Sequence, residues 1–342
     1  MDRKKTNHFI LVISFLLFVS SFLNAQSKTG TTIGQFLKID PSSRIASIGN
    51  AGVSMWGEIS SMFYNPASLG RIPGSDVQFT FNKWLADITY DYAAVGVNVE
   101  GIGAFAFIVT ILNSGEMDVR TVEQPLGTGE KFSVNNLALG LGYGLMITDR
   151  VSIGFQGNYI SETIWHSSIY TFGFNLGVQY EVFAEGLTLG ASLSNFGGDA
   201  SYDGRDLYVN YDFDPDNYGD NDHLPAELRT GSFGLPVIFR AGASYQFKFN
   251  EDYNLILAAD AMHPNDNSES INLGAELNLL NYVSLRGGYR NLLLPDSEGG
   301  LTLGAGFKVD YLGSNNIRFD YAYSDYGRLN ASHRLTLGMA FN

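Results

Sequence analysis

The segment from Leu137 to Ile147 reads LALGLGYGLMI, with large apolar side chains at every odd position and chiefly glycine or alanine at the even positions. Successive side chains of a β-strand point to opposite faces, so one face of this strand is apolar and the other is nearly bare. A soluble sheet instead places polar side chains on the face that meets water. The pattern therefore favours a strand whose apolar face meets lipid.

Fourteen segments after residue 75 keep their apolar residues in one phase, from Val77–Lys83 to His333–Asn342. Their connections alternate between short ones, such as Asp149-Arg150, and long ones, such as Asn113–Val134 and Phe196–Pro236. Short turns at one end and long loops at the other are typical of bacterial outer-membrane barrels. We therefore predict an all-β fold, a 14-stranded antiparallel transmembrane outer-membrane β-barrel. The alternative is a large secreted all-β protein with some apolar surface.

Charged residues in the second half of the chain are confined to the phase opposite the apolar residues. That phase is expected to face the lumen, because the other must lie in hydrocarbon. Two interpretations remain open for these residues: an ion-pair network that stiffens the barrel, or a path for an anion or carboxylate. The predicted lumenal residues are Glu276, Arg286, Arg290, Lys308, Asp310, Arg318, Asp320 and Arg334.

The first residues of the chain differ from the rest. Residues 1–25 combine three basic residues near the start with an apolar stretch that ends at Asn24-Ala25, which predicts a secretory signal peptide. Its removal leaves 18 basic and 34 acidic residues, a balance that argues against nucleic-acid binding. The sequence holds no cysteine, so we expect neither disulfides nor a thiol for lipid attachment.

Residues 26–75 do not alternate, and we expect them to precede a barrel that spans residues 76–342. A helix start is predicted where Asp40 can cap and Pro41 can occupy the first turn, and a second one at Asn65-Pro66-Ala67. The glycine faces of the fourth to sixth strands permit close approach of another backbone. We therefore predict a short helical N-terminal plug that lies against these strands. The alternative is a periplasmic extension.

Taken together, these features resemble the FadL superfamily of outer-membrane barrels. Within that superfamily, Phe36–Gly49 (FLKIDPSSRIASIG), Tyr64–Leu69 (YNPASL) and Trp84–Ile88 (WLADI) are similar to the PorV/PorQ family. The resemblance implies a non-enzymatic outer-membrane protein of the type IX secretion system without a cofactor. Its partners would be outer-membrane lipid and secreted cargo proteins or other secretion-system subunits.

A second function is open from the same resemblance, namely a FadL-like channel for hydrophobic small molecules. Such a channel predicts an apolar pocket that runs from the loops to a lateral gap between strands, with a plug that can shift. No Gly-x-Ser-x-Gly elbow is present, and we find no catalytic constellation. A lipid hydrolase with a site scattered over adjacent strands is the remaining enzymatic alternative.

The longest predicted loop is rich in aspartate. Asp212, Asp214 and Asp216 alternate as in a Ca²⁺ loop, but the glycine expected after the third aspartate is displaced to Gly219. A solvated acidic loop that contacts a protein partner is the favoured interpretation, with a weak ion site as the alternative. The histidines after residue 25 lie in separate predicted loops without paired spacing, so we predict no metal site.

Overall fold

The computed structural model describes residues 29–182, 186–214, 216, 223–311 and 315–341. Fourteen antiparallel strands form a closed β-barrel, as predicted from the sequence. They are β1 (Ser75–Lys83), β2 (Thr89–Val99), β3 (Gly103–Asn113), β6 (Val134–Thr148), β7 (Val151–Ile164), β8 (Ser167–Glu181), β9 (Leu187–Gly197), β13 (Ile238–Lys248), β14 (Tyr253–Pro264), β15 (Ser270–Leu279), β16 (Val283–Leu292), β17 (Leu301–Tyr311), β18 (Asn315–Asp325) and β19 (Ala331–Phe341).

Each wall strand pairs with the next one along the chain, and β1 pairs with β19 to close the barrel. The β8–β9 ladder is irregular, because its pairing passes from Phe174↔Phe196 directly to Leu176↔Leu193. A second irregularity lies between β15 and β16. Closure leaves no unpaired sheet edge, which a strand in hydrocarbon requires. Within the described ranges, no helix is long and apolar enough to cross a membrane.

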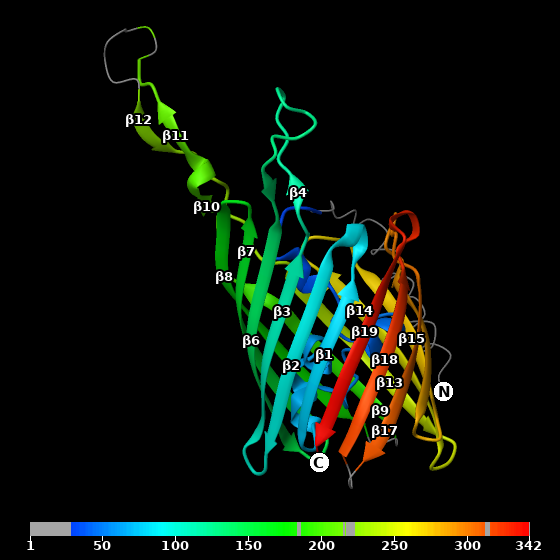
Figure 1. Ribbon diagram of the computed structural model, residues 1–342. Helices are drawn as coiled ribbons and strands as arrows, with labels where there is room; N and C mark the ends of the chain where they lie inside the picture. Colours follow the sequence, from blue (N-terminus) through cyan, green and yellow to red (C-terminus); the bar gives the residue numbers. More distant parts are fainter. Residues whose placement is uncertain (1–28, 183–185, 215, 217–222, 312–314, 342) are drawn as a thin grey trace, which may run out of the picture.

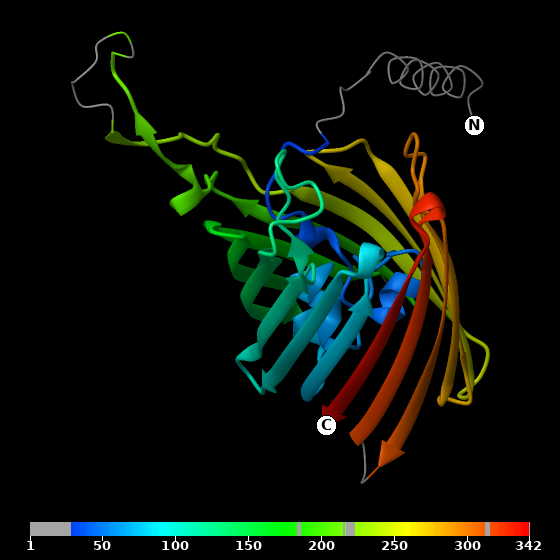
Figure 2. The same ribbon diagram turned by 45° about the horizontal axis from the view of Figure 1, so that its top comes forward.

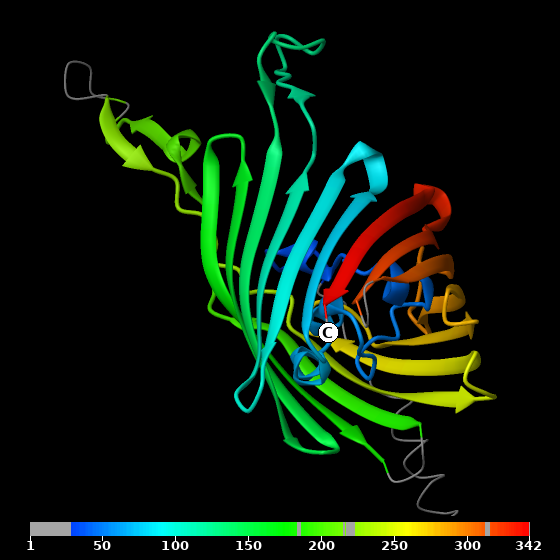
Figure 3. The ribbon, with the colours of Figure 1, turned by 60° about the horizontal axis from the view of Figure 1, so that its bottom comes forward.

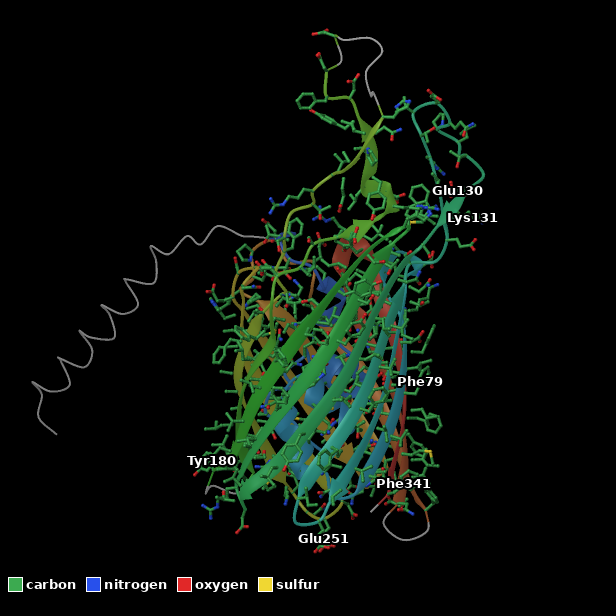
Figure 4. All side chains as sticks on the ribbon, turned by 90° about the vertical axis from the view of Figure 1, so that its left-hand side faces the viewer. Phe79, Glu130, Lys131, Tyr180, Glu251 and Phe341 are labelled. Atoms are coloured by element: carbon green, nitrogen blue, oxygen red, sulfur yellow. The ribbon has the colours of Figure 1, made fainter. Side chains whose placement is uncertain are left out.

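The wall alternates between an apolar outer face and a polar inner face. On β1, Phe79 is 51% exposed and points away from the barrel, whereas its neighbour Gln78 is 1% exposed (Figure 4). The same alternation places Phe155 outside and Gln156 inside on β7. Large apolar side chains that are exposed along every strand can be stable only against lipid, so the outer face is the membrane-facing surface.

The two ends of the barrel differ in their connections. Turns such as residues 100–102, 149–150 and 280–282 gather at what we call the turn end, together with the C-terminal end of β19 (Figure 1). The opposite, loop end carries the longer connections.

Two connections expected to be plain loops contain short strands, and some of these strands project above the barrel. The short elements at the loop end are η4 (Leu85–Asp87), β4 (Met117–Asp118), β5 (Lys131–Phe132), β10 (Asp203–Gly204), η5 (Arg205–Leu207), β11 (Tyr208–Tyr211), β12 (Leu224–Glu227) and η6 (Gly327–Leu329).

Residues 29–74, which we call the inner segment, run through the lumen (Figures 2 and 3). The segment contains η1 (Gln35–Lys38), α2 (Ser43–Ser47), η2 (Ile59–Phe63) and η3 (Pro66–Arg71).

The predicted helix start at Asp40 and Pro41 was wrong. Helix α2 begins at Ser43, because the Ser42 hydroxyl caps it by accepting from the Ile45 amide at 3.1 Å. Asp40 instead accepts a hydrogen bond from the Asn50 side chain at 2.6 Å.

Candidate functional site in the barrel lumen

Asn65 and Pro66 lie directly against the glycine-rich wall. The Asn65 side-chain oxygen caps η3 by accepting from the Ala67 amide at 3.0 Å, and its amide nitrogen donates to the Val178 carbonyl of β8 at 3.0 Å. A Cβ atom added at Gly177 would lie 1.9 Å from the Asn65 oxygen, and one added at Gly154 would lie 2.2 Å from the Pro66 backbone. The bare strand faces therefore admit the backbone of the inner segment.

The loop before η2 is held by polar side chains of the wall. The Val53 amide donates to Asp260 of β14 at 2.8 Å. The Val53 carbonyl accepts from Asn65 at 2.7 Å and from Gln179 of β8 at 3.1 Å. Buried backbone groups outside regular structure need such partners, because water does not reach them. These contacts hold the inner segment against β8 and β14.

Buried ion pairs join the inner segment to β15, β16 and β18. Arg44 makes two contacts with Glu276, at 2.7 and 2.8 Å. Arg286 contacts the same carboxylate at 2.7 Å and Asp320 at 2.5 Å. Burial by itself lowers the pKa of Arg44, but its contacts with Glu276 outweigh this effect and hold the pKa above the ordinary range. The four side chains form one chain of alternating charge.

The other predicted lumenal residues lie apart from these four side chains. Arg318 pairs with Asp76 of β1 at 2.7 Å, and Lys308 pairs with Asp310 at 3.4 Å as two half-exposed side chains near the turn end. Arg290 donates to the Tyr326 hydroxyl at 2.5 Å. Arg334 is fully buried, and no described carboxylate lies within ion-pair distance of Arg290 or Arg334. The predicted set is therefore several separate groups.

The predicted ion site remains without support from geometry. Asp212 accepts a hydrogen bond from the Asp214 amide at 3.0 Å, and Asp212, Asp214 and Asp216 are exposed or nearly so. Residues 215 and 217–222 lie outside the described residues. Among the residues that the structure does describe, no three potential ligand side chains come together.

An apolar band crosses the lumen on one side, between the inner segment and strands β2, β3 and β6–β8. Leu112, Ile169 and Leu235 lie at its loop end, and Ile72 and Ala104 lie at its turn end. All of its residues are buried. The remaining members are Ile33, Phe36, Leu37, Ile39, Ile59, Met62, Leu69, Tyr90, Tyr92, Ala94, Ala106, Ile108, Ala138 and Ile160.

Three cavities lie along the lumen. One of about 370 Å³ faces the turn end and is lined by charged and amide side chains, including Glu58 and Arg318. One of about 30 Å³ lies within the apolar band, next to Ile108 and Ala138. The third, of about 200 Å³, lies toward the loop end between the inner segment and strands β13–β16. The band itself is therefore packed, and the two larger cavities have both polar and apolar lining residues.

Sequence reasoning missed Arg44, Asp76, Arg240 and Asp260 as lumenal charges. Arg44 lies in a segment without alternation, so no pattern assigns its side chain to a face. The other three lie in the inward phase of their strands, as their burial shows, and that phase could have identified them.

Comparison with known proteins shows the fold. No protein-family model and no curated protein sequence matches the chain. Among solved structures, it is similar to the Pseudomonas putida toluene transporter TodX, with a TM-score of 0.54 and 13% identity over 86% of this chain and 95% of that chain. The CymD monoaromatic hydrocarbon channel gives 0.55 and 12% over 90% and 99%. The Ralstonia pickettii toluene transporter TbuX gives 0.52 and 14% over 90% and 98%.

The chain thus shares its barrel architecture with these channels over most of its length. The closed barrel and its lipid-facing exterior place the protein in an outer membrane.

Proposed function

We propose that the chain is a non-enzymatic outer-membrane channel for small hydrophobic molecules. The observation that carries the proposal is the apolar band, which runs from the loop end to the turn end on one side of the lumen. A channel for polar solutes needs a polar route. A hydrophobic solute instead lowers its free energy when it leaves water and enters an apolar route. The neighbouring structures, described as toluene transporters and a monoaromatic hydrocarbon channel, support the same substrate class.

The band is closed in this structure, because its cavity of about 30 Å³ is smaller than a monoaromatic molecule. Leu37 and Phe63 of the inner segment line that cavity together with Ile108 and Ala138 of the wall. Its other lining residues include polar side chains of the wall and Arg240. We propose that the inner segment acts as a plug and that its displacement from β3 and β6 opens the route. Asn175 also lines this cavity and lies at the irregular point of the β8–β9 ladder. We propose that this point of the wall is the lateral exit.

The test is uptake of labelled toluene by intact Gram-negative cells that produce the protein, compared with cells that lack it. Ala138→Phe places a ring in the cavity and is expected to reduce uptake. Ala305→Phe is the matched control, because Ala305 lies on the outer face of β17 and contacts no lumenal residue of the band. Uptake no faster than in cells without the protein would overturn the proposal.

A second candidate is binding of secreted cargo or other subunits of a type IX secretion system. It rests on the PorV/PorQ resemblance of residues 36–49 and 64–69 and on the projecting β11–β12 segment. There Tyr208, Tyr211 and Phe213 are 61%, 53% and 77% exposed, which is unusual for aromatic side chains without a partner. Capture of C-terminal signal domains by the purified protein tests this candidate. Loss of capture in the Tyr208→Ser/Tyr211→Ser variant would support it, and failure to capture any such domain would refute it.

A further inference from the structure

The loop-end half of the lumen holds three arginines, two of them buried, whose charge is incompletely balanced. Arg240 of β13 and Arg334 of β19 are 4% and 0% exposed, and Arg290 of β16 is half-buried. In the described part of the chain, none of the three has a carboxylate within 4.0 Å, unlike Arg44, Arg286 and Arg318. An arginine remains charged in proteins, and a buried charge needs a counter-charge.

The hydrogen bonds of these arginines are also incomplete. Arg240 donates to the Ser194 hydroxyl at 3.0 Å, and Arg290 donates to the Tyr326 hydroxyl. The Arg290 Nε atom and the Arg334 Nε and Nη1 atoms are buried without a partner. A guanidinium group presents five N–H donors, and leaving them unsatisfied in a buried site is costly. The wall thus offers more donors than the chain itself satisfies.

Two acidic residues lie within electrostatic reach of the cluster. Asp40 acts on Arg240 and Arg290, and Asp260 acts on Arg240. Both carboxylates are already engaged, Asp40 by the Asn50 side chain and Asp260 by the Val53 amide. Lys38, which lies nearby, is neutralised by Asp266 at 2.9 Å. Three guanidinium groups therefore face two carboxylates, and one positive charge remains.

Beside this charge lies a cavity that can hold a small molecule. Its volume is about 200 Å³, and its charged lining residues are Arg240, Arg290, Lys38 and Asp40. Ser268, Ser270 and Asn267 add hydroxyl and amide groups at the loop end. Arg240 also lines the small cavity in the apolar band, so the two cavities are neighbours. The larger one is too small for a long alkyl chain.

We propose that this cavity, which we call the arginine cavity, binds one small oxyanion, a carboxylate or a phosphate, between Arg240 and Arg290. Planar guanidinium forks match the paired oxygens of such anions. The bound anion balances the remaining positive charge and bridges the inner segment to β13 and β16. Binding of the anion does not require passage of hydrophobic molecules, although Arg240 lines both cavities.

The experiment measures thermal unfolding of the purified full chain in detergent micelles. Sodium chloride is replaced by sodium acetate or sodium phosphate at constant ionic strength. The expected result is a rise of about 2 °C or more in the unfolding midpoint, since a ligand that binds only the folded state stabilises it. A rise with acetate alone identifies a carboxylate site, and a larger rise with phosphate identifies a phosphate site. No rise with either anion overturns the proposal.

Two variants locate the effect. Arg240→Gln/Arg290→Gln removes both guanidinium groups that line the cavity, so its response to the oxyanion is expected to be lost whatever its midpoint in chloride. Arg318→Gln is the control, because it breaks the pair with Asp76 and lowers the midpoint but keeps the response. If the double variant does not fold, Arg290→Gln alone is expected to weaken the response about tenfold in anion concentration. An equal response in the arginine-cavity variants and the wild type would place the anion elsewhere and overturn the proposal.

Discussion

Arg44 and Glu276 are 232 positions apart in the sequence and form a two-contact ion pair inside the barrel. Arg44 comes from the inner segment and Glu276 from β15, so the pair links the lumenal chain to the wall. Arg286 contacts the same carboxylate from the neighbouring strand. Glu276 therefore contacts two guanidinium groups at once, and its removal would leave Arg44 without its ion-pair partner and Arg286 with Asp320 alone.

The variant Glu276→Gln is expected to lower the free energy of unfolding by about 3 kcal/mol, because breaking a buried ion pair leaves an uncompensated charge. Urea unfolding in micelles, followed by intrinsic fluorescence, measures the change. The exposed pair of Glu298 with Arg328 provides the control, and Glu298→Gln is expected to have little effect. A similar loss of unfolding free energy in the two variants would show that the ion pairs of Glu276 contribute no more than an exposed ion pair.

Gly154 of β7 is expected to be intolerant of any side chain. In Gly154→Ala, the new methyl group would overlap the Pro66 backbone, and we expect a loss of about 1 to 3 kcal/mol in unfolding free energy. Gly157→Ala on the same strand is the matched control, because its added carbon would meet nothing closer than 3.8 Å. That control should be neutral or slightly stabilised. Limited proteolysis of the inner segment reports whether Gly154→Ala releases it.

The sequence predicts the wall well, because burial imposes a strict two-residue alternation there. The fourteen strands, the lipid-facing phase and the inward phase all follow from that alternation. A segment such as Leu137–Ile147 shows it most clearly, since its inward glycines and alanine lie beneath residues such as Met62 and Leu69.

The inner segment is harder to predict from the sequence. Its residues contact wall strands that are distant in sequence, so local patterns identify caps but not partners. Asp40 resembles a helix cap, yet its side chain binds Asn50, and Ser42, two residues later, caps the helix. Lys308 and Asp310 share the inward phase with Arg286, but they lie near the turn end and pair with each other. Alternation assigns a face and leaves the depth along the strand undetermined.

Asp266 is expected to make the attachment of η1 dependent on pH. Burial raises the pKa of Asp266, but hydrogen bonds from Gln35, Lys38 and Thr32 outweigh this and place the pKa below the ordinary value of 3.8. A carboxyl with a depressed pKa stabilises the folded state fully above the unfolded value. This stabilisation is lost as the pH falls below 3.8 through the folded-state pKa.

The measurement compares unfolding midpoints of the wild type and Asp266→Asn from pH 7 to pH 2. The difference is expected to be constant from pH 7 to about pH 5 and to shrink below pH 4. Glu251→Gln alters an exposed turn residue and serves as the control (Figure 4). A difference that does not change with pH would contradict a role for the ionised carboxylate.

A disulfide between the inner segment and the wall is expected to block uptake of hydrophobic molecules. The hydroxyl oxygens of Ser43 and Thr336 lie 2.7 Å apart, so cysteines at these positions would place two sulfur atoms within bonding range. The chain has no cysteine of its own, so an introduced pair has no competing thiol.

If the plug must shift for passage, cells with the oxidised Ser43→Cys/Thr336→Cys variant should take up toluene no faster than cells without the protein, and a reductant should restore uptake. Thr163→Cys/Ser168→Cys, whose hydroxyls lie 3.0 Å apart between β7 and β8, joins two wall strands and should leave uptake unchanged. Full uptake through the oxidised Ser43–Thr336 variant would mean that molecules pass without displacement of this part of the inner segment.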